Sequence, residues 1–333
     1  RWVLVAQAVI WRFLMQIGMF LHKFASPRPA KPDFVRTFKT TVAEKKGEIK
    51  LHFYVPADWH KEIKGFAGGF DGRTWPVVVN FHGGGFTLGK ATDDARWCET
   101  VVREVDAICV SVDYRLAPEH AFPTAVEDGA DSILYLVAHA AELGIDVDRI
   151  AVSGFSAGAN MCFTVPLRLE EELNDECAFG EDRRNSSNKG ISIKVVVAWY
   201  PPVDYTRTRE EKRSITPKIH QLPAMFTDLF DDSYLSPPTM DMSQPYLSPG
   251  VAPRHLLAGL PQEIMIFACE YDMLLDEAIK FTKRLREEVN KTVHYFLVEG
   301  AAHGFDKAPN PIRQPKEIKD HYSKACREMK RLL

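Results

Sequence analysis

The sequence predicts an α/β protein with a mostly parallel sheet of about eight strands and helices on both faces. From residue 75 onward, short β-branched apolar runs alternate with helical segments. This alternation is typical of parallel strands that are buried on both sides. The chain has 333 residues, of which 45% are hydrophobic and 26% are charged. It is therefore long and apolar enough to form a sizeable core.

The elements follow from hydrophobic periodicity and from turn signals. Residues 34–42 and 48–56 predict an antiparallel pair around a charged turn. Further strands are expected at 75–82, 107–114, 149–153, 193–201, 263–272 and 292–300. Helices are expected at 91–104, 124–144, 157–173, 276–290 and 316–332. The polar stretch 174–190 predicts a solvated loop. The long Pro-, Thr- and Met-containing stretch 204–246 predicts a lid or binding loop.

Charge and cysteine content narrow the classes of partner. The formal net charge is −3 and the basic residues form no stripe, so nucleic acid is not an expected partner. The six cysteines form no CxxC pair and no cluster with metal-ligand spacing. We expect reduced core cysteines, no metal and no organic cofactor. No sequence signal defines an oligomeric state.

Residues 1–24 form a nearly continuous apolar stretch interrupted by Gln7, Arg12 and Gln16. The stretch approaches the roughly 20 residues needed to span a bilayer, but a central arginine is costly there. No clean cleavage site for a signal peptide follows it. The favoured interpretation is an amphipathic helix that packs as a lid or contacts a membrane surface, with a membrane anchor as the alternative. The expected location is intracellular, cytoplasmic or membrane-associated, and the secretory pathway stays open.

The motif "GFSAG" indicates a nucleophilic serine, because Gly154, Ser156 and Gly158 match the pattern G-x-S-x-G. A strand precedes this motif and a helix follows it, as required for a sharp turn that exposes a serine hydroxyl. Such a hydroxyl becomes a nucleophile when a histidine removes its proton and a carboxylate orients that histidine.

The partners of Ser156 are expected downstream, in the order acid and then histidine. Asp272 follows one strand and His303 follows the last strand, both on the side where open α/β sheets bind ligands. Each residue alone has a plainer interpretation: Asp272 as a turn or capping residue, and His303 as a structural loop histidine. Glu270 and Asp276 are rival carboxylates. The combination predicts a Ser156–His303–Asp272 triad.

The run "HGGG" at residues 82–85 predicts an oxyanion hole. Three glycines leave backbone amides bare where a tetrahedral oxyanion needs donors. Gly83, Gly84 and Gly85 would supply some of these donors, and Ala157, after the nucleophile, would supply another. A phosphate-binding loop does not fit, because the run lacks GxGxxG spacing and a Walker lysine. His82 is expected to brace the loop by hydrogen bonding.

Together, these motifs resemble the hormone-sensitive-lipase-like branch of the α/β-hydrolase superfamily. The shared segments are "HGGGFTLG", "VDYRLAPEHAFPTAVED", "GFSAGAN", "YDMLLDEA" and "AHGF". The resemblance implies the α/β-hydrolase fold and the same triad and oxyanion hole. It also implies that Asp276 helps to fix the histidine loop. Within "DYRLAPE" it implies a structural brace of three residues: Asp113, Arg115 and Glu119.

The same resemblance implies a helical cap formed by residues 1–40 and by an insertion at about 204–246. Residues 41–333 would then form the catalytic domain that contains the insertion. One departure is Phe155, where the family usually carries Asp before the nucleophile. Aromatic and Met residues of the cap suggest either an apolar pocket wall or ordinary packing: Trp11, Phe13, Met225, Phe226 and Phe230.

The expected activity is hydrolysis of carboxylic esters of a lipid or a specialised metabolite through an acyl-enzyme. The small-molecule ester is the expected partner. Two alternatives remain. One is acyl transfer or another triad-dependent reaction on a specialised metabolite. The other is a non-catalytic receptor such as the gibberellin receptors of this family, which the complete set Ser156, Asp272 and His303 disfavours.

Overall fold

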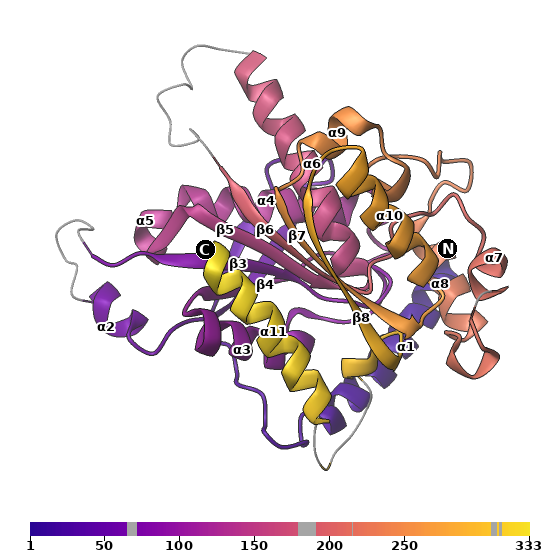
Figure 1. Ribbon diagram of the computed structural model, residues 1–333, viewed down its shortest axis with the longest axis horizontal. Helices are drawn as coiled ribbons and strands as arrows, with labels where there is room; N and C mark the ends of the chain where they lie inside the picture. Colours follow the sequence, from indigo (N-terminus) through magenta and orange to yellow (C-terminus); the bar gives the residue numbers. More distant parts are fainter. Residues whose placement is uncertain (65–71, 179–190, 215, 308–311, 313–314) are drawn as a thin grey trace.

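An eight-stranded sheet forms the centre of the molecule (Figure 1). This computed structural model describes residues 1–64, 72–178, 191–214, 216–307, 312 and 315–333. The strands are β1 (Phe34–Lys39), β2 (Glu48–Tyr54), β3 (Trp75–Phe81), β4 (Ile108–Asp113), β5 (Ile145–Phe155), β6 (Ile193–Trp199), β7 (Glu263–Tyr271) and β8 (Thr292–Ala302). Their spatial order is β1-β2-β4-β3-β5-β6-β7-β8.

The sheet is antiparallel at one edge and parallel elsewhere. β1 pairs with β2, and β2 pairs with β4, in antiparallel fashion. All other neighbouring strands run parallel. Every residue of β3 is buried, which matches its uninterrupted apolar sequence and its place inside a sheet covered on both faces. The expected fold class and the antiparallel pair are confirmed.

Helices cover both faces of the sheet and create two cores. The α-helices are α1 (Trp2–His22), α2 (Trp59–Lys64), α3 (Ala95–Val105), α4 (Thr124–Ala138), α5 (Ala140–Leu143), α6 (Ala157–Ala178), α7 (Arg209–Ser214), α8 (Ala224–Tyr234), α9 (Arg254–Ala258), α10 (Leu275–Glu287) and α11 (Lys316–Leu332). Side chains of α4, α6 and α10 share one buried cluster. Those of α3 and α11 share the other, and both helices lie in front of the sheet in Figure 1.

Some boundaries differ from the sequence prediction. A 3-10 turn at Ala91–Asp94 precedes α3, so the helix expected at 91–104 is divided. Helix α6 continues to Ala178, which converts the start of the expected loop at 174–190 into helix. Residues 179–190 lie outside the described part. The thiols of five cysteines are free and buried: Cys98, Cys109, Cys162, Cys269 and Cys326.

Helices α1, α7 and α8 lie beyond the carboxyl ends of the central strands (Figure 1). Helix α1 packs against α8, with the rings of Trp11 and Phe226 in edge-to-face contact at 4.6 Å between centroids. We call α1 together with residues 202–246 the cap. Strand β1 belongs to the sheet although it falls within residues 1–40. The boundaries of the cap domain stay a prediction.

Candidate active site

A strained turn presents Ser156 between β5 and α6. Its φ angle is +51°, a left-handed conformation that costs a non-glycine residue free energy. The Ser156 amide donates to the carbonyl of Trp199 at 2.9 Å, which fixes the turn to the neighbouring strand. A Cβ on Gly158 would lie 1.9 Å from the carbonyl oxygen of Phe81. Glycine in the second half of "GFSAG" is therefore required by packing against β3.

Three side chains from separate strand ends form one hydrogen-bonded chain. The Oγ of Ser156 lies 2.8 Å from Nε2 of His303. The Nδ1 of His303 lies 2.7 Å from Oδ2 of Asp272. A carboxylate accepts from Nδ1–H, which leaves Nε2 free to accept the serine proton. The structure thus brings together the three residues that the motif order selected.

Asp272 is held in a single orientation. Its carboxylate is almost fully buried, and Oδ1 accepts the amide of Leu274 at 3.0 Å. The other oxygen is then directed at His303. Glu270 does not share this role, because its carboxylate accepts the amide of Gly300 at 2.7 Å. Glu270 therefore braces the end of β8 just before the histidine.

The glycine run lies directly beside the nucleophile. A Cβ on Gly83 would lie 3.5 Å from the Cβ of Ser156. Gly84 has φ +118°, and a Cβ there would lie 2.3 Å from the carbonyl oxygen of Leu88. Gly85 has φ +60°, and its Cβ would overlap the ring of Phe230 from α8 at 2.3 Å. The absence of side chains at Gly84 and Gly85 is thus needed for the turn and for packing against the cap.

Ala157 has a backbone amide that makes no hydrogen bond within its own helix. It is the first residue of α6, and the first amides of a helix have no acceptor one turn earlier in the same helix. Ala157 lines the same cavity as Gly83, Gly84 and Ser156. The positive end of the helix dipole adds to the attraction of this position for negative charge.

His82 contacts the glycine loop and Tyr114. Its Nδ1–H donates to the carbonyl of Gly83 at 2.8 Å, since a carbonyl can only accept. The imidazole stacks on Tyr114 with centroids 4.2 Å apart. The Tyr114 hydroxyl donates to the carbonyl of His82 at 2.7 Å. These contacts hold the start of the glycine loop from both sides.

A buried charge cluster behind the histidine loop was missed by the sequence reasoning. The carboxylate of Asp306 accepts hydrogen bonds from the hydroxyls of Tyr200 and Tyr322 and pairs with Lys307 at 3.0 Å. The ammonium of Lys307 also pairs with Asp94 at 2.8 Å. The proximity of an Asp-Lys pair to His303 in sequence was the available signal, but nothing in the sequence indicated that Asp306 is buried and that Lys307 is largely buried beside it.

The cluster favours the charged forms of the Asp306 carboxylate and the Lys307 ammonium. Burial alone would raise the pKa of Asp306, but Lys307 and the two tyrosine hydroxyls hold it below its ordinary value. Burial alone would lower the pKa of Lys307, yet Asp306 and Asp94 raise it well above its ordinary value. The Tyr200 ring meets the His303 ring edge-to-face, with centroids 4.8 Å apart. The charge cluster therefore supports the wall against which the imidazole rests.

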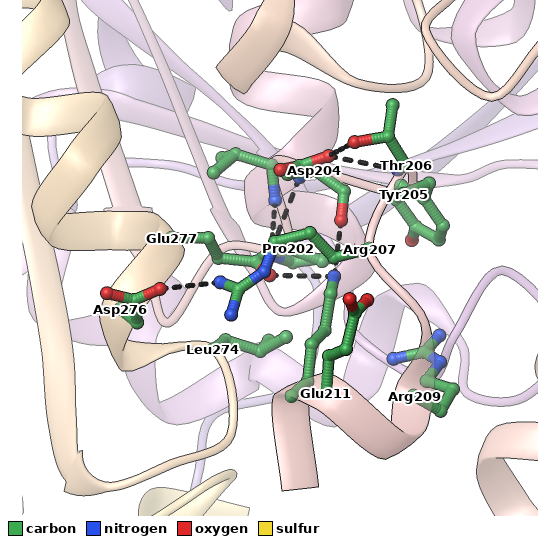
Figure 2. Close-up of polar contacts among 12 residues, drawn as sticks. Pro202, Asp204, Tyr205, Thr206, Arg207, Arg209, Glu211, Leu274, Asp276 and Glu277 are labelled. Atoms are coloured by element: carbon green, nitrogen blue, oxygen red, sulfur yellow. Dashed lines mark hydrogen bonds and ion pairs between the residues drawn. The ribbon is translucent and has the colours of Figure 1, made fainter. Parts of the chain in front are cut away.

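The structure places Asp276 away from the role that the family resemblance implied. Its carboxylate pairs with Arg207 at 2.6 Å, as Figure 2 shows. It also pairs with Lys280 at 2.8 Å. Asp276 is in α10, and Arg207 belongs to the inserted segment. Both cations lower the pKa of Asp276. Asp276 thus links the cap to α10, whereas Asp272 and Glu270 contact the His303 region.

A second ion pair anchors the insertion more deeply. The ammonium of Lys212 in α7 lies 2.7 Å from Oε2 of Glu277, and both side chains are almost fully buried. The other oxygen of Glu277 accepts the amides of Val203 and Asp204 at 2.8 and 3.3 Å. Figure 2 shows Glu277 beside Asp204 and Arg207 at the base of the insertion. One buried carboxylate therefore holds both the start of the insertion and its first helix.

The segment "DYRLAPE" joins the body to α1 as well as bracing the interior. Arg115 pairs with buried Asp128 at 2.6 Å, and Asp113 accepts the amide of Ala91 at 3.1 Å. Glu119 instead pairs with Arg12 of α1 at 2.8 Å. The first two residues are internal braces as expected, whereas Glu119 fastens the cap.

Ser156 and His303 open into a cavity of about 460 Å³ between the sheet edge and the cap. The cavity wall is mainly apolar. Cap residues in it include Trp11, Met15, Phe226 and Phe230. Phe13 and Met225 are more than half exposed, at 63% and 52%, and are absent from the wall. The pocket-wall interpretation is therefore right for three of the five aromatic and Met residues and wrong for these two.

Among the described residues, no group of three or more His, Cys, Asp and Glu side chains is arranged to hold a metal ion. A serine hydroxyl that is hydrogen-bonded to an imidazole can attack an electrophilic carbonyl. Nearby backbone amides can stabilise the oxyanion that results.

The class of protein follows from the serine turn and its sheet. Ser156 has a left-handed backbone conformation and lies between a central parallel strand and the next helix. Its hydrogen-bonding partners Asp272 and His303 follow later strands. This arrangement is typical of an α/β hydrolase. Comparison with known proteins agrees, because a family model described as "alpha/beta hydrolase fold" matches residues 78–307. The chain belongs to this family, in its hormone-sensitive-lipase-like branch of esterase- and lipase-type enzymes.

Several relatives are named esterases or lipases. An arylesterase of Saccharolobus solfataricus is 32% identical over 282 residues, which is 80% of this chain and 78% of that protein. The carboxylic ester hydrolase LipN of Mycobacterium tuberculosis is 31% identical over 262 residues, covering 78% of this chain and 61% of LipN. Human hormone-sensitive lipase is 40% identical over 96 residues, only 29% of this chain and 9% of that protein.

Solved structures of esterases also resemble this chain. An esterase of Pyrobaculum calidifontis superposes with a TM-score of 0.74 at 28% identity, covering 97% of this chain and 92% of that one. The carboxylesterase EstE1, cloned from a metagenomic library, superposes with a TM-score of 0.76 at 26% identity over 98% of both chains. The likeness therefore extends over the cap as well as the sheet.

Proposed function

We propose that this chain hydrolyses carboxylic esters through an acyl-enzyme formed on Ser156. The observation that carries the proposal is the continuous bond from Ser156 through His303 to Asp272 in the wall of an apolar cavity. The relatives named esterases support the same reaction class. The apolar wall favours esters whose acyl or alcohol group is itself apolar.

In the first half of the reaction, Nε2 of His303 takes the proton of the Ser156 hydroxyl as Oγ attacks the ester carbonyl. The carbonyl oxygen becomes an anion and accepts hydrogen bonds from the amide of Ala157 and from the Gly83–Gly85 loop. His303 then protonates the departing alcohol. Asp272 holds the imidazole in the required tautomer and stabilises its charged form.

In the second half, His303 removes a proton from water as the water oxygen attacks the acyl carbonyl. The bond between the acyl carbon and Oγ of Ser156 then breaks, the acid leaves, and His303 returns the proton to Oγ. The left-handed conformation of Ser156 favours both steps, because it projects Oγ away from the turn and toward the cavity. The cap covers this space with Trp11 and Phe226. These apolar side chains lower the exposure of the developing charge to water, which strengthens its contacts with the backbone amides.

The decisive experiment measures hydrolysis of p-nitrophenyl esters from acetyl to palmitoyl by the wild type and by Ser156→Ala. We expect turnover to fall by at least about 10³-fold in the variant with an unchanged circular dichroism spectrum. Retained turnover by a folded variant would refute the proposal.

Acyl transfer is separated from hydrolysis in the same assay. Addition of a competing alcohol to the wild type should leave free acid as the main product. A transferred ester as the main product would replace the hydrolase assignment by a transferase. A receptor on this scaffold would show tight binding without turnover, and the complete Ser156–His303–Asp272 chain weighs against that function.

A further inference from the structure

The outer face of α1 is apolar, exposed and uncharged. Its side chains recur every three or four residues, so they form one stripe along the helix. Large apolar residues of α1 with more than 40% of their surface exposed are Trp2, Val3, Val9, Ile10, Phe13, Leu14, Ile17, Phe20 and Leu21. Exposed contiguous apolar patches of this kind mark contact with a partner or a membrane.

The opposite face of α1 packs against the rest of the protein. Arg12, the sole Lys or Arg within α1, turns inward and pairs with Glu119. It also donates to the carbonyls of Thr87 and Ala117 at 2.9 and 2.7 Å. Trp11, Met15 and other inner residues of α1 line the cavity. By length and apolar composition α1 could cross a bilayer, but these contacts fasten it along the protein surface.

The charges within residues 1–32 favour an anionic partner for the outer face of α1. Residues 1–32 contain no Asp or Glu, whereas Lys and Arg occur five times in a chain of formal charge −3. Basic residues lie at both ends of α1. Arg1 precedes it, and its guanidinium donates to the carbonyl of Pro118 at 2.9 Å; the exposed Arg28 and Lys31 follow it. The guanidinium of Arg28 lies over the ring of Phe24, 5.7 Å from its centroid. An apolar stripe flanked by cations complements an anionic lipid surface.

A second copy of the chain fits less well. A two-fold contact between two α1 helices would place the basic ends of one copy near those of the other. That contact would bring like charges together at the edge of an apolar interface. We propose that α1 docks the protein on an anionic lipid surface, with its outer face in the interfacial layer and its axis along the surface.

In this arrangement helix α1 lies between the membrane and the cavity. Trp2, Phe13 and Phe20 would enter the interfacial layer, where aromatic side chains are favoured. The inner face of the same helix roofs the cavity that contains Ser156. This part of the inference rests on the proposed function, and it assigns esters dissolved in the lipid as the substrate class. Docking itself is measured by binding alone, so its failure and the failure of hydrolysis are distinguishable.

The test is co-sedimentation with vesicles of phosphatidylcholine alone and with vesicles containing 30% phosphatidylserine. We expect the wild type to bind the anionic vesicles at least tenfold more tightly, with the difference shrinking as salt rises. Phe13→Glu should reduce this binding at least tenfold and leave hydrolysis of soluble p-nitrophenyl butyrate unchanged. Ile279→Glu is the matched control, because Ile279 is an exposed aliphatic residue of α10, 48% exposed.

A second variant separates charge from apolar contact. Arg28→Gln/Lys31→Gln should bring the affinity for anionic vesicles down toward that for neutral vesicles. Equal binding of Phe13→Glu and the wild type would overturn the proposal. A wild type that sediments as a dimer without vesicles and that Phe13→Glu converts to a monomer would assign the face to a second copy. Binding that resists both 1 M salt and alkaline carbonate would indicate a spanning helix and would also overturn it.

Discussion

The ammonium of Lys307 lies over the ring of Phe155, 3.9 Å from its centroid. Phe155 directly precedes Ser156, and Lys307 lies four residues after His303. This cation–π contact therefore joins the strand that presents the nucleophile to the loop that presents the base. The pairs of Lys307 with Asp94 and Asp306 complete the cluster. A phenyl ring in place of the family's usual aspartate is thus paired with a largely buried cation.

Lys307→Met should destabilise the protein by about 3–5 kcal/mol near neutral pH, because two buried carboxylates lose their shared cation. The lowered pKa of Asp306 contributes stability above its unfolded value of 3.8, and that stability is lost as pH falls through the folded pKa. The raised pKa of Lys307 contributes stability below 10.5, and that stability is lost as pH rises through the folded pKa. Both contributions are present at pH 7.

Urea unfolding of Lys307→Met at pH 7.5 and pH 5 tests this account. Without the cation, burial favours protonated Asp306, so the loss of stability should be smaller at pH 5. Lys324→Met is the control: its ammonium lies 4.1 Å from the Phe296 centroid but on an exposed side chain, worth about 0.5–1 kcal/mol. Equal losses for the two variants, or no dependence on pH, would contradict the role of the cluster.

Gly85→Ala should disable the glycine loop through a clash as well as through backbone strain. The φ of +60° costs an alanine about 1–2 kcal/mol, and the new methyl would overlap the Phe230 ring. We expect kcat/KM for a p-nitrophenyl ester to fall at least about 10²-fold, since small displacements of oxyanion donors are costly.

Gly300→Ala provides the matched control for backbone strain. Gly300 has φ +68°, and a Cβ there would meet nothing within 4 Å. This variant should lose stability by a similar amount while keeping most of its activity. Gly85→Ala/Phe230→Ala should recover part of kcat/KM, because the overlap is removed. Equal activity losses for the two glycine variants would show that strain alone explains the effect.

Much of the fold and the Ser156–His303–Asp272 geometry could be predicted, because local signals determine them. Periodicity locates the strands, and each of these three residues directly follows one. The charge cluster of Asp94, Asp306 and Lys307 could not be predicted from the sequence, because the placement of a lysine against buried carboxylates depends on long-range packing. The orientation of Asp276 depends on Arg207, which lies in an irregular insertion. Sequence spacing carries no information on such a pairing.

Asp272→Asn should lower kcat about 10³- to 10⁴-fold with little change in KM. The amide would keep the shape of the side chain but would lose the charge that orients the imidazole and stabilises its protonated form. Asp276→Asn is the matched control, since Asp276 contacts Arg207 and Lys280 at the cap base. It should leave kcat within about threefold of the wild type. A larger kcat loss in Asp276→Asn than in Asp272→Asn would reverse the two roles.

Lys212→Met should loosen the cap by leaving Glu277 as a buried carboxylate without its cation. Loss of one member of a buried pair typically costs about 3–5 kcal/mol, and a displaced insertion should raise KM for long-chain esters. Lys212→Met/Glu277→Gln should recover most of both losses, because the amide oxygen of glutamine can still accept from Val203 and Asp204 while carrying no charge. Urea unfolding and the p-nitrophenyl ester series measure the two effects. If the double variant is no more stable than the single variant, the uncompensated charge is not the cause, and the lysine side chain anchors α7 through its apolar packing and its bond to the Asp204 carbonyl.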